Sequence, residues 1–249
     1  MTPGQLVKAV ALALDVPEET VTQHDRNLVV TGLRTKGGRG RSAPSVTPLD
    51  AARLLVATLA SGRIKDSAGI VRVFSKVTHE PPQRYAEISD RIKAATGKFP
   101  TDVMSRFSDK ALDSLAEGHN IIDALAALIA DASVPSEVEH LKRRFGAMTI
   151  GCHMPLARAS IGRQKEIANY YSRHAGQGAA SLRSQVEQRE PHEVYLRRYG
   201  IHQDREIYGN VIMLLGKAFR EGGLPFGSAQ DALDDLLGVK KAKSKKKAT

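Results

Sequence analysis

The sequence predicts a mainly α-helical fold with a small β insertion. Apolar residues recur at three- and four-residue spacing over much of the chain, as in residues 3–14 and 49–59, which is typical of amphipathic helices. This period is lost in residues 145–161, where small, β-branched and polar residues indicate a strand pair. Hydrophobic residues make up 41% and charged residues 26% of the chain, which is ordinary for a soluble globular protein.

Two short helices are expected at the N-terminus. The first covers residues 3–14. Asp15, Pro17 and the acids that follow mark the start of the second, since a proline and carboxylates favour the first turn of a helix. This second helix is expected to run to about Thr31 and to end at Gly32. A helix, a tight turn and a second helix of this length can form a helix-turn-helix.

A basic, glycine-rich segment, residues 34–45, follows the second helix. It has no large apolar residue, so it is expected to form an exposed loop or arm. No acid occurs in residues 31–49, and arginines next to glycines can enter a narrow minor groove. The basic residues of this arm are Arg34, Lys36, Arg39 and Arg41.

Further helices are expected along the rest of the chain. A third begins with a cap at Thr47 and a proline at position 48, and ends at Gly62. The later ones are residues 66–77, 82–95, 101–116, 120–132, 163–174, 204–220 and 228–237. We expect three regions: a DNA-binding domain in residues 1–62, a mainly helical oligomerisation or effector region in residues 63–238, and a disordered lysine-rich tail in residues 239–249.

Charge and composition narrow the classes of function. The net charge is +10, from 37 Lys and Arg against 27 acids, and such a basic protein attracts nucleic acid or an anionic surface. The longest apolar stretch, residues 121–129, is too short to span a bilayer, and the N-terminus does not resemble a secretory signal. The single cysteine excludes a disulfide framework and a multi-cysteine zinc site. We expect a cytoplasmic protein that uses no cofactor, metal or membrane.

The second helix carries residue types that can read DNA. Val21 and Leu28 fall on one side and are expected to be buried. Gln and Asn can pair with adenine, Arg with guanine, and Thr with phosphate or a thymine methyl group. The residues expected to face DNA are Thr20, Thr22, Gln23, Arg26 and Asn27.

The N-terminal quarter also resembles a known family. The run Thr20-Val21-Thr22-Gln23-His24, with Arg26, Leu28 and Gly32-Leu33 and then a Gly/Arg stretch, is similar to the winged helix-turn-helix regulators of bacteria. The resemblance covers roughly residues 3–60 and implies a recognition helix followed by a basic wing. Two features depart from the family pattern. Asp25 stands where an apolar residue is usual, and residues 35–42 lack the β-branched residues of good strands.

These observations predict a sequence-specific double-stranded DNA-binding protein that regulates transcription and is not an enzyme. A homodimer is expected, because one recognition helix reads too few base pairs for genomic specificity. Residues 63–238 would supply dimer contacts or a site for a protein or small-molecule signal. An alternative is a phage or mobile-element adaptor for packaging or replication initiation that uses the same helix-turn-helix. A plain helical hairpin with a solvated loop is the least specific interpretation.

An enzymatic site near Cys152 is the weakest hypothesis. Cys152 and His153 are neighbours in a suspected strand, so their side chains are expected to point to opposite faces. The remaining histidines show no metal-ligand spacing, and the glycines of residues 37–40 lack the strand and helix that a phosphate-binding loop requires. We therefore predict no catalytic, cofactor or metal residues.

Overall fold

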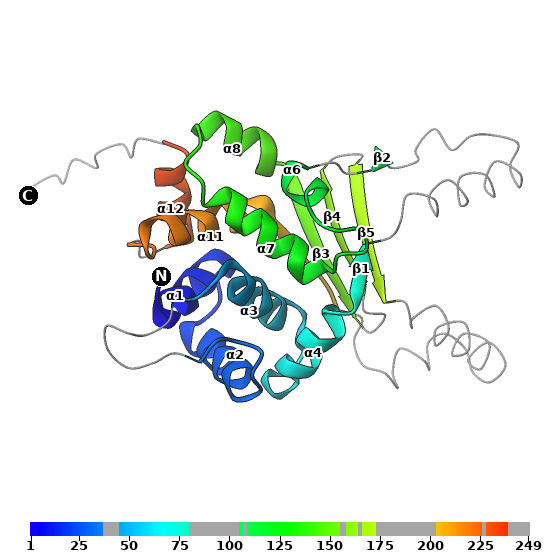
Figure 1. The fold of residues 1–249 in the computed structure, drawn as a ribbon. Helices are drawn as coiled ribbons and strands as arrows, with labels where there is room; N and C mark the ends of the chain where they lie inside the picture. The colour runs from blue at the N-terminus through cyan, green and yellow to red at the C-terminus, as the bar shows by residue number, and fades with distance from the viewer. Residues whose placement is uncertain are drawn as a thin grey trace, which may run out of the picture.

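The computed structural model describes residues 1–36, 45–79, 105–106, 109–154, 158–163, 166–172, 203–225 and 228–238. Helices gather on one side of a sheet, and the fold is mainly helical, as predicted (Figure 1). The α-helices are α1 (Pro3–Leu14), α2 (Glu18–Val30), α3 (Pro48–Ala60), α4 (Ser67–Phe74), α6 (Lys110–Asp113), α7 (Ile121–Ala132), α8 (Val138–Phe145), α11 (Gly209–Glu221) and α12 (Ala229–Leu236), with a 3₁₀ turn, η1, at Ile64–Asp66.

The first three helices begin where local capping signals place them. Thr2 and Thr47 each form a capping box at the start of α1 and α3, with proline in the first turn. Between α1 and α2 the chain turns at Asp15, which has a left-handed backbone with φ of 53°. Gly32 follows α2 with φ of 70°, as expected for a glycine that ends a helix.

Helices α3, α7 and α11 form the centre of the helical layer. α3 packs on α7, and α7 packs on α11, where a Cβ at Gly216 would lie 2.5 Å from a backbone atom of Ala132. The absent side chain therefore lets these two helices approach closely. α1 also packs on α11, and one hydrophobic cluster includes Leu6 and Leu215. The domain boundary predicted at residue 62 falls between helices that share this core. The division into residues 1–62 and residues 63–238 stays a prediction.

The sheet is larger than the predicted strand pair. The strands are β1 (Val77–His79), β2 (Ser105–Arg106), β3 (Met148–Met154), β4 (Arg158–Arg163), β5 (Glu166–Ser172) and β6 (Gln203–Tyr208). Their order is β1-β5-β4-β3-β6, with all neighbours antiparallel, while β2 pairs in parallel with β5. The predicted pair is β3 and β4, in which Ile150 lies opposite Ile161. Both side chains are buried, and α3 and α11 contact β3.

Several expected helices were wrong or too long. Within residues 163–174 the described elements are strands, because Arg163 ends β4 and Glu166–Ser172 form β5. Residues 204–208 belong to β6, which precedes α11. Within residues 101–116 the described elements are β2 and the short α6, and α8 was not expected. β5 has pairing partners in β1, β2 and β4, and these hydrogen bonds override a local pattern compatible with a helix. The helix expected in residues 82–95 and the tail in residues 239–249 lie outside the described residues.

Candidate nucleic-acid interface

The inner side of α2 is fixed by apolar packing and by buried hydrogen bonds. Val21 and Leu28 are fully buried, which confirms the side that the sequence assigned to the core. His24 is buried beside them, and its Nδ1 lies 2.6 Å from the hydroxyl of Ser67 on α4. These contacts set the rotation of α2 about its axis, and so determine which residues it presents to solvent.

The outer side of α2 carries a polar stripe. Glu19, Gln23 and Arg26 are exposed, and their spacing of four and three residues places them on one face of the helix. None of the three side chains is held by a hydrogen bond within the described part of the chain. Val30, 85% exposed, continues the same stripe at the end of the helix. Two of the predicted DNA-facing residues, Gln23 and Arg26, therefore lie where a groove could reach them.

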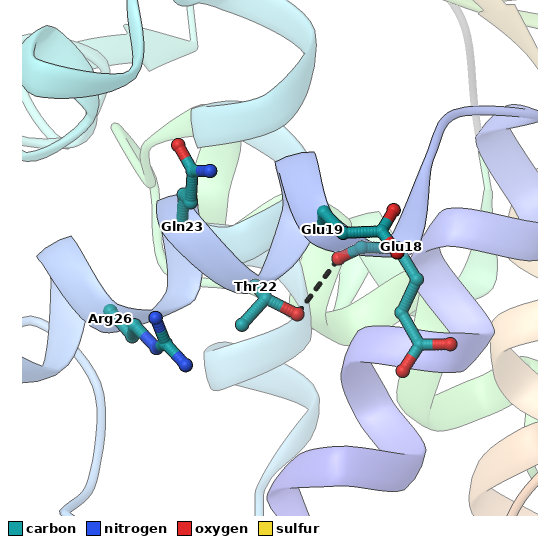
Figure 2. Close-up of a pocket in the computed structure, with 5 residues that line it drawn as sticks. All are labelled: Glu18, Glu19, Thr22, Gln23 and Arg26. Carbon is teal, nitrogen blue, oxygen red and sulfur yellow. Dashed lines mark hydrogen bonds between the residues drawn. The ribbon is translucent and has the colours of Figure 1, made fainter.

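An open hollow lies along this outer face (Figure 2). Its lining residues are Glu18, Glu19, Thr22, Gln23 and Arg26. The Thr22 hydroxyl donates a 2.8 Å hydrogen bond to the carbonyl of Glu18, so it can meet a ligand only through its lone pairs. Thr20 is half-buried at the flank of the helix. The sequence prediction missed Glu19 as a member of the polar stripe, because it treated Glu18 and Glu19 only as signals for the start of a helix.

Asn27 has a structural role that the sequence did not reveal. Its side-chain amide donates to the carbonyl of Ile64 at 2.9 Å and to that of Lys65 at 3.2 Å, and so ties η1 to α2. Because the fold uses both N–H donors of this amide, the predicted contact of Asn27 with adenine would require these bonds to break, and it stays a prediction. The contact brings the exposed Arg63 and Lys65 close to the C-terminal half of α2, which adds two cations that the prediction missed.

Arg34 is buried, and this corrects its predicted position in a DNA-binding arm. Its Nη2 donates to Asp25 Oδ2 at 2.7 Å, and its Nε forms an ion pair with Asp25 Oδ1. Only 5% of the Arg34 side chain is exposed, so its guanidinium cannot reach a phosphate or a minor groove. The unusual acid at position 25 is thereby explained, because it neutralises Arg34. Burial nevertheless raises the pKa of the Asp25 carboxyl, an effect that the hydrogen bond and charge of Arg34 oppose.

Asp50 ties together the two described ends of the glycine-rich segment. At its N-terminal end, the Thr35 backbone N–H donates to Asp50 Oδ1 at 3.1 Å. After it, the Thr47 backbone N–H and hydroxyl both donate to Asp50 Oδ2 at 2.9 Å. The Asp50 residue is only 2% exposed, and Val46 is anchored through its N–H to the carbonyl of Met1. The segment therefore leaves and rejoins the body of the protein at a single buried carboxylate.

Charge is unevenly distributed over this candidate interface. The exposed acids Asp15, Glu18 and Glu19 lie at the N-terminal end of α2, where the helix dipole favours negative charge. The exposed cations Arg26, Lys36, Arg63 and Lys65 lie towards its C-terminal end, where the only exposed acid in η1 is Asp66. Arg39 and Arg41 lie outside the described residues. The two ends of the interface can therefore not make the same kind of contact with a polyanion.

The Cys152 thiol lies in the core and not at the surface. Cys152 is buried, and burial raises the pKa of its thiol to about 12, so the thiolate is scarce at neutral pH. Within the described ranges, no group of three or more His, Cys, Asp and Glu residues is placed to hold a metal ion. No helix among the described residues is long and apolar enough to cross a membrane.

Comparison with known proteins adds no relative. No protein-family model, curated protein or solved structure matches the chain. The likeness to winged helix-turn-helix regulators therefore depends on the motif in residues 3–60 and on the order α1, turn, α2. The wing itself would fall in residues 37–44, which are outside the described residues.

Proposed function

We propose that the protein binds double-stranded DNA sequence-specifically through the outer face of α2, and that it regulates transcription. The observation that carries this proposal is the two-sided character of α2. Its inner side is fixed in the core by Val21 and Leu28, while Gln23 and Arg26 are exposed and unengaged on its outer side. A rigidly held helix with free Gln and Arg side chains suits direct readout, since Gln pairs with adenine and Arg with guanine in the major groove.

The surroundings of α2 support phosphate contacts beside this readout. Arg63 and Lys65 are brought to the helix by Asn27, and Lys36 is exposed where the glycine-rich segment begins. Cations that flank a recognition helix fix its register on the duplex without reading sequence. The glycine-rich segment, whose sequence includes Arg39 and Arg41, is fixed at its two described ends, because Thr35 and Thr47 both donate to Asp50. In this proposal they contact the backbone or the neighbouring minor groove.

A homodimer is part of the proposal. One helix contacts only a few base pairs, and two copies that bind adjacent half-sites would supply the specificity that regulation needs. Residues 63–238 would provide the dimer contacts or a site for a signal. The alternative, an adaptor that marks a phage or mobile-element site for a partner enzyme, uses the same interface. Co-purification with an ATPase or nuclease, in place of a change in transcript levels, would distinguish the adaptor.

The test is a salt-titrated binding assay on the full chain, with duplex fragments from around its own gene. The wild-type protein is expected to prefer one fragment. A Gln23→Ala/Arg26→Ala variant should lose roughly tenfold or more of that preference. The matched control is Arg143→Ala, which removes an exposed cation from α8, on the far side of the molecule from α2 (Figure 1). Equal binding to every fragment that vanishes at moderate salt would contradict sequence-specific readout.

A further inference from the structure

Glu19 shares the outer face of α2 with the two proposed base-reading residues. It lies four residues before Gln23 and seven before Arg26, and all three are exposed. With a helical rise of about 1.5 Å per residue, Glu19 and Arg26 are separated by about 10 Å along the axis. Neighbouring base pairs are about 3.4 Å apart, so this stripe matches about three base-pair steps. A groove that admits Gln23 and Arg26 therefore also meets Glu19.

A carboxylate in this position has narrow requirements. An ionised Glu can only accept hydrogen bonds, so phosphates and the N7, O6 and O4 acceptors of the major groove repel it. The N4 amino group of cytosine donates a hydrogen bond to the major groove, and Glu and Asp are its usual partners. The position also fits, because the N-terminal residues of a recognition helix contact base edges in helix-turn-helix proteins. Glu19 lies in the first turn of α2.

We propose that Glu19 is a specificity-determining residue that accepts a hydrogen bond from the N4 amino group of a cytosine. This inference rests on the proposed DNA-binding function and assigns a base to one position of the target. It also gives a role to the acidic end of the interface, where Glu19 excludes targets that present an acceptor. Gln23 and Arg26 then read the base pairs that follow.

Glu18 offers a matched control. It has the same charge, lies in the same first turn and lines the same hollow, so its effect on the helix dipole is equivalent. One residue corresponds to a rotation of about 100° around the helix, which takes Glu18 off the stripe. Figure 2 shows the carboxylates of Glu18 and Glu19 pointing to different sides of α2. If negative charge acts only in a general way, substitutions of Glu18 and Glu19 should change binding equally. If Glu19 reads a base, only its substitution should change the base preference.

The experiment selects duplexes from a randomised library with the full-length wild-type protein, and repeats the selection with Glu19→Gln and with Glu18→Gln. The wild type is expected to enrich a cytosine at one position. Glu19→Gln should change the preference at that position alone from cytosine to adenine, because Gln pairs with the N6 and N7 of adenine. The switch in relative affinity should be roughly 5- to 150-fold. Glu18→Gln should keep the wild-type preference, and thermal unfolding should show that both variants are folded.

Two outcomes would overturn the inference, and they are distinguishable. In the first outcome, the wild type enriches a sequence and Glu19→Gln enriches the same one, or both variants only bind every duplex more tightly. Glu19 then does not read a base, although the proposed function stands. If the wild type enriches no sequence, the proposed function fails together with this assignment.

Discussion

Helices α2 and α3 are close in sequence and have the same length, yet the fold uses them differently. α2 buries a narrow inner side, at Val21, His24, Asp25 and Leu28. α3 is buried at Asp50 and from Ala51 to Ala60 except Arg53, because α1, α2, α4 and α7 pack around it and the sheet contacts it. A helix enclosed in this way can only support the fold, whereas one with a free face can bind a partner. Substitutions in α3 should therefore change stability, and substitutions on the outer face of α2 should change binding.

The largest expected loss of stability comes from breaking the ion pair between Asp25 and Arg34, on the inner edge of α2. Arg34→Met leaves the buried Asp25 carboxylate without its partner, which should reduce the free energy of unfolding by about 3–5 kcal/mol. Replacing both residues, as Asp25→Leu/Arg34→Met, should recover most of this loss because no unpaired charge is left. Denaturant unfolding of the two variants measures both values. Equal losses in both would mean that the two side chains contribute through packing rather than through charge.

The next largest loss of stability is expected in the buried helix α3. Leu55 is fully buried, and Leu55→Ala should reduce the free energy of unfolding by about 2–5 kcal/mol, through lost burial and the cavity that remains. At temperatures where the variant is still folded, its preference among DNA fragments should match that of the wild type. A variant of normal stability with altered DNA preference would break the distinction between the two helices.

The pH dependence of stability tests the environment of Asp25. Its pKa in the folded protein is raised above the ordinary value of 3.8 by burial, so the folded state binds more protons than the unfolded state between these two pKa values. The contribution of Asp25 to stability is therefore fully present below pH 3.8 and is lost as the pH rises through the folded pKa. The free energy of unfolding should be measured across this pH window for the wild type and for Asp25→Asn. We expect it to decrease more with rising pH in the wild type than in the variant. The opposite trend would mean that Arg34 dominates and lowers the pKa.

The smallest effect is expected on the outer face of α2. Gln23→Ala and Arg26→Ala should each change the free energy of unfolding by less than about 0.5 kcal/mol, since both side chains are exposed and unengaged within the described part of the chain. Chemical denaturation of each variant tests this. A loss above about 1 kcal/mol would show that the outer face is structural, and would weaken its proposed use for binding.

The residues of the candidate interface could be only partly predicted from the sequence. Val21 and Leu28 were correctly assigned to the core, and Gln23 and Arg26 were expected on the exposed side, because periodicity within one helix indicates which residues share a face. Arg34 lay in a stretch without acids in the sequence, but the fold places Asp25 beside it. The partners of Asn27 on η1 were equally invisible, since they are 37 and 38 residues away in the chain.

By itself, the sequence determined the helices whose start signals are local. The caps at Thr47 and Asn120 begin α3 and α7, because a side chain that accepts hydrogen bonds from nearby N–H groups needs no distant partner. Only the tertiary structure decided that β5 is a strand, since a strand forms its backbone hydrogen bonds with other segments of the chain. It likewise buried Arg34 with Asp25 and joined Thr35 and Thr47 through Asp50, because electrostatic and hydrogen-bond contacts depend on distance in space and not on separation in sequence.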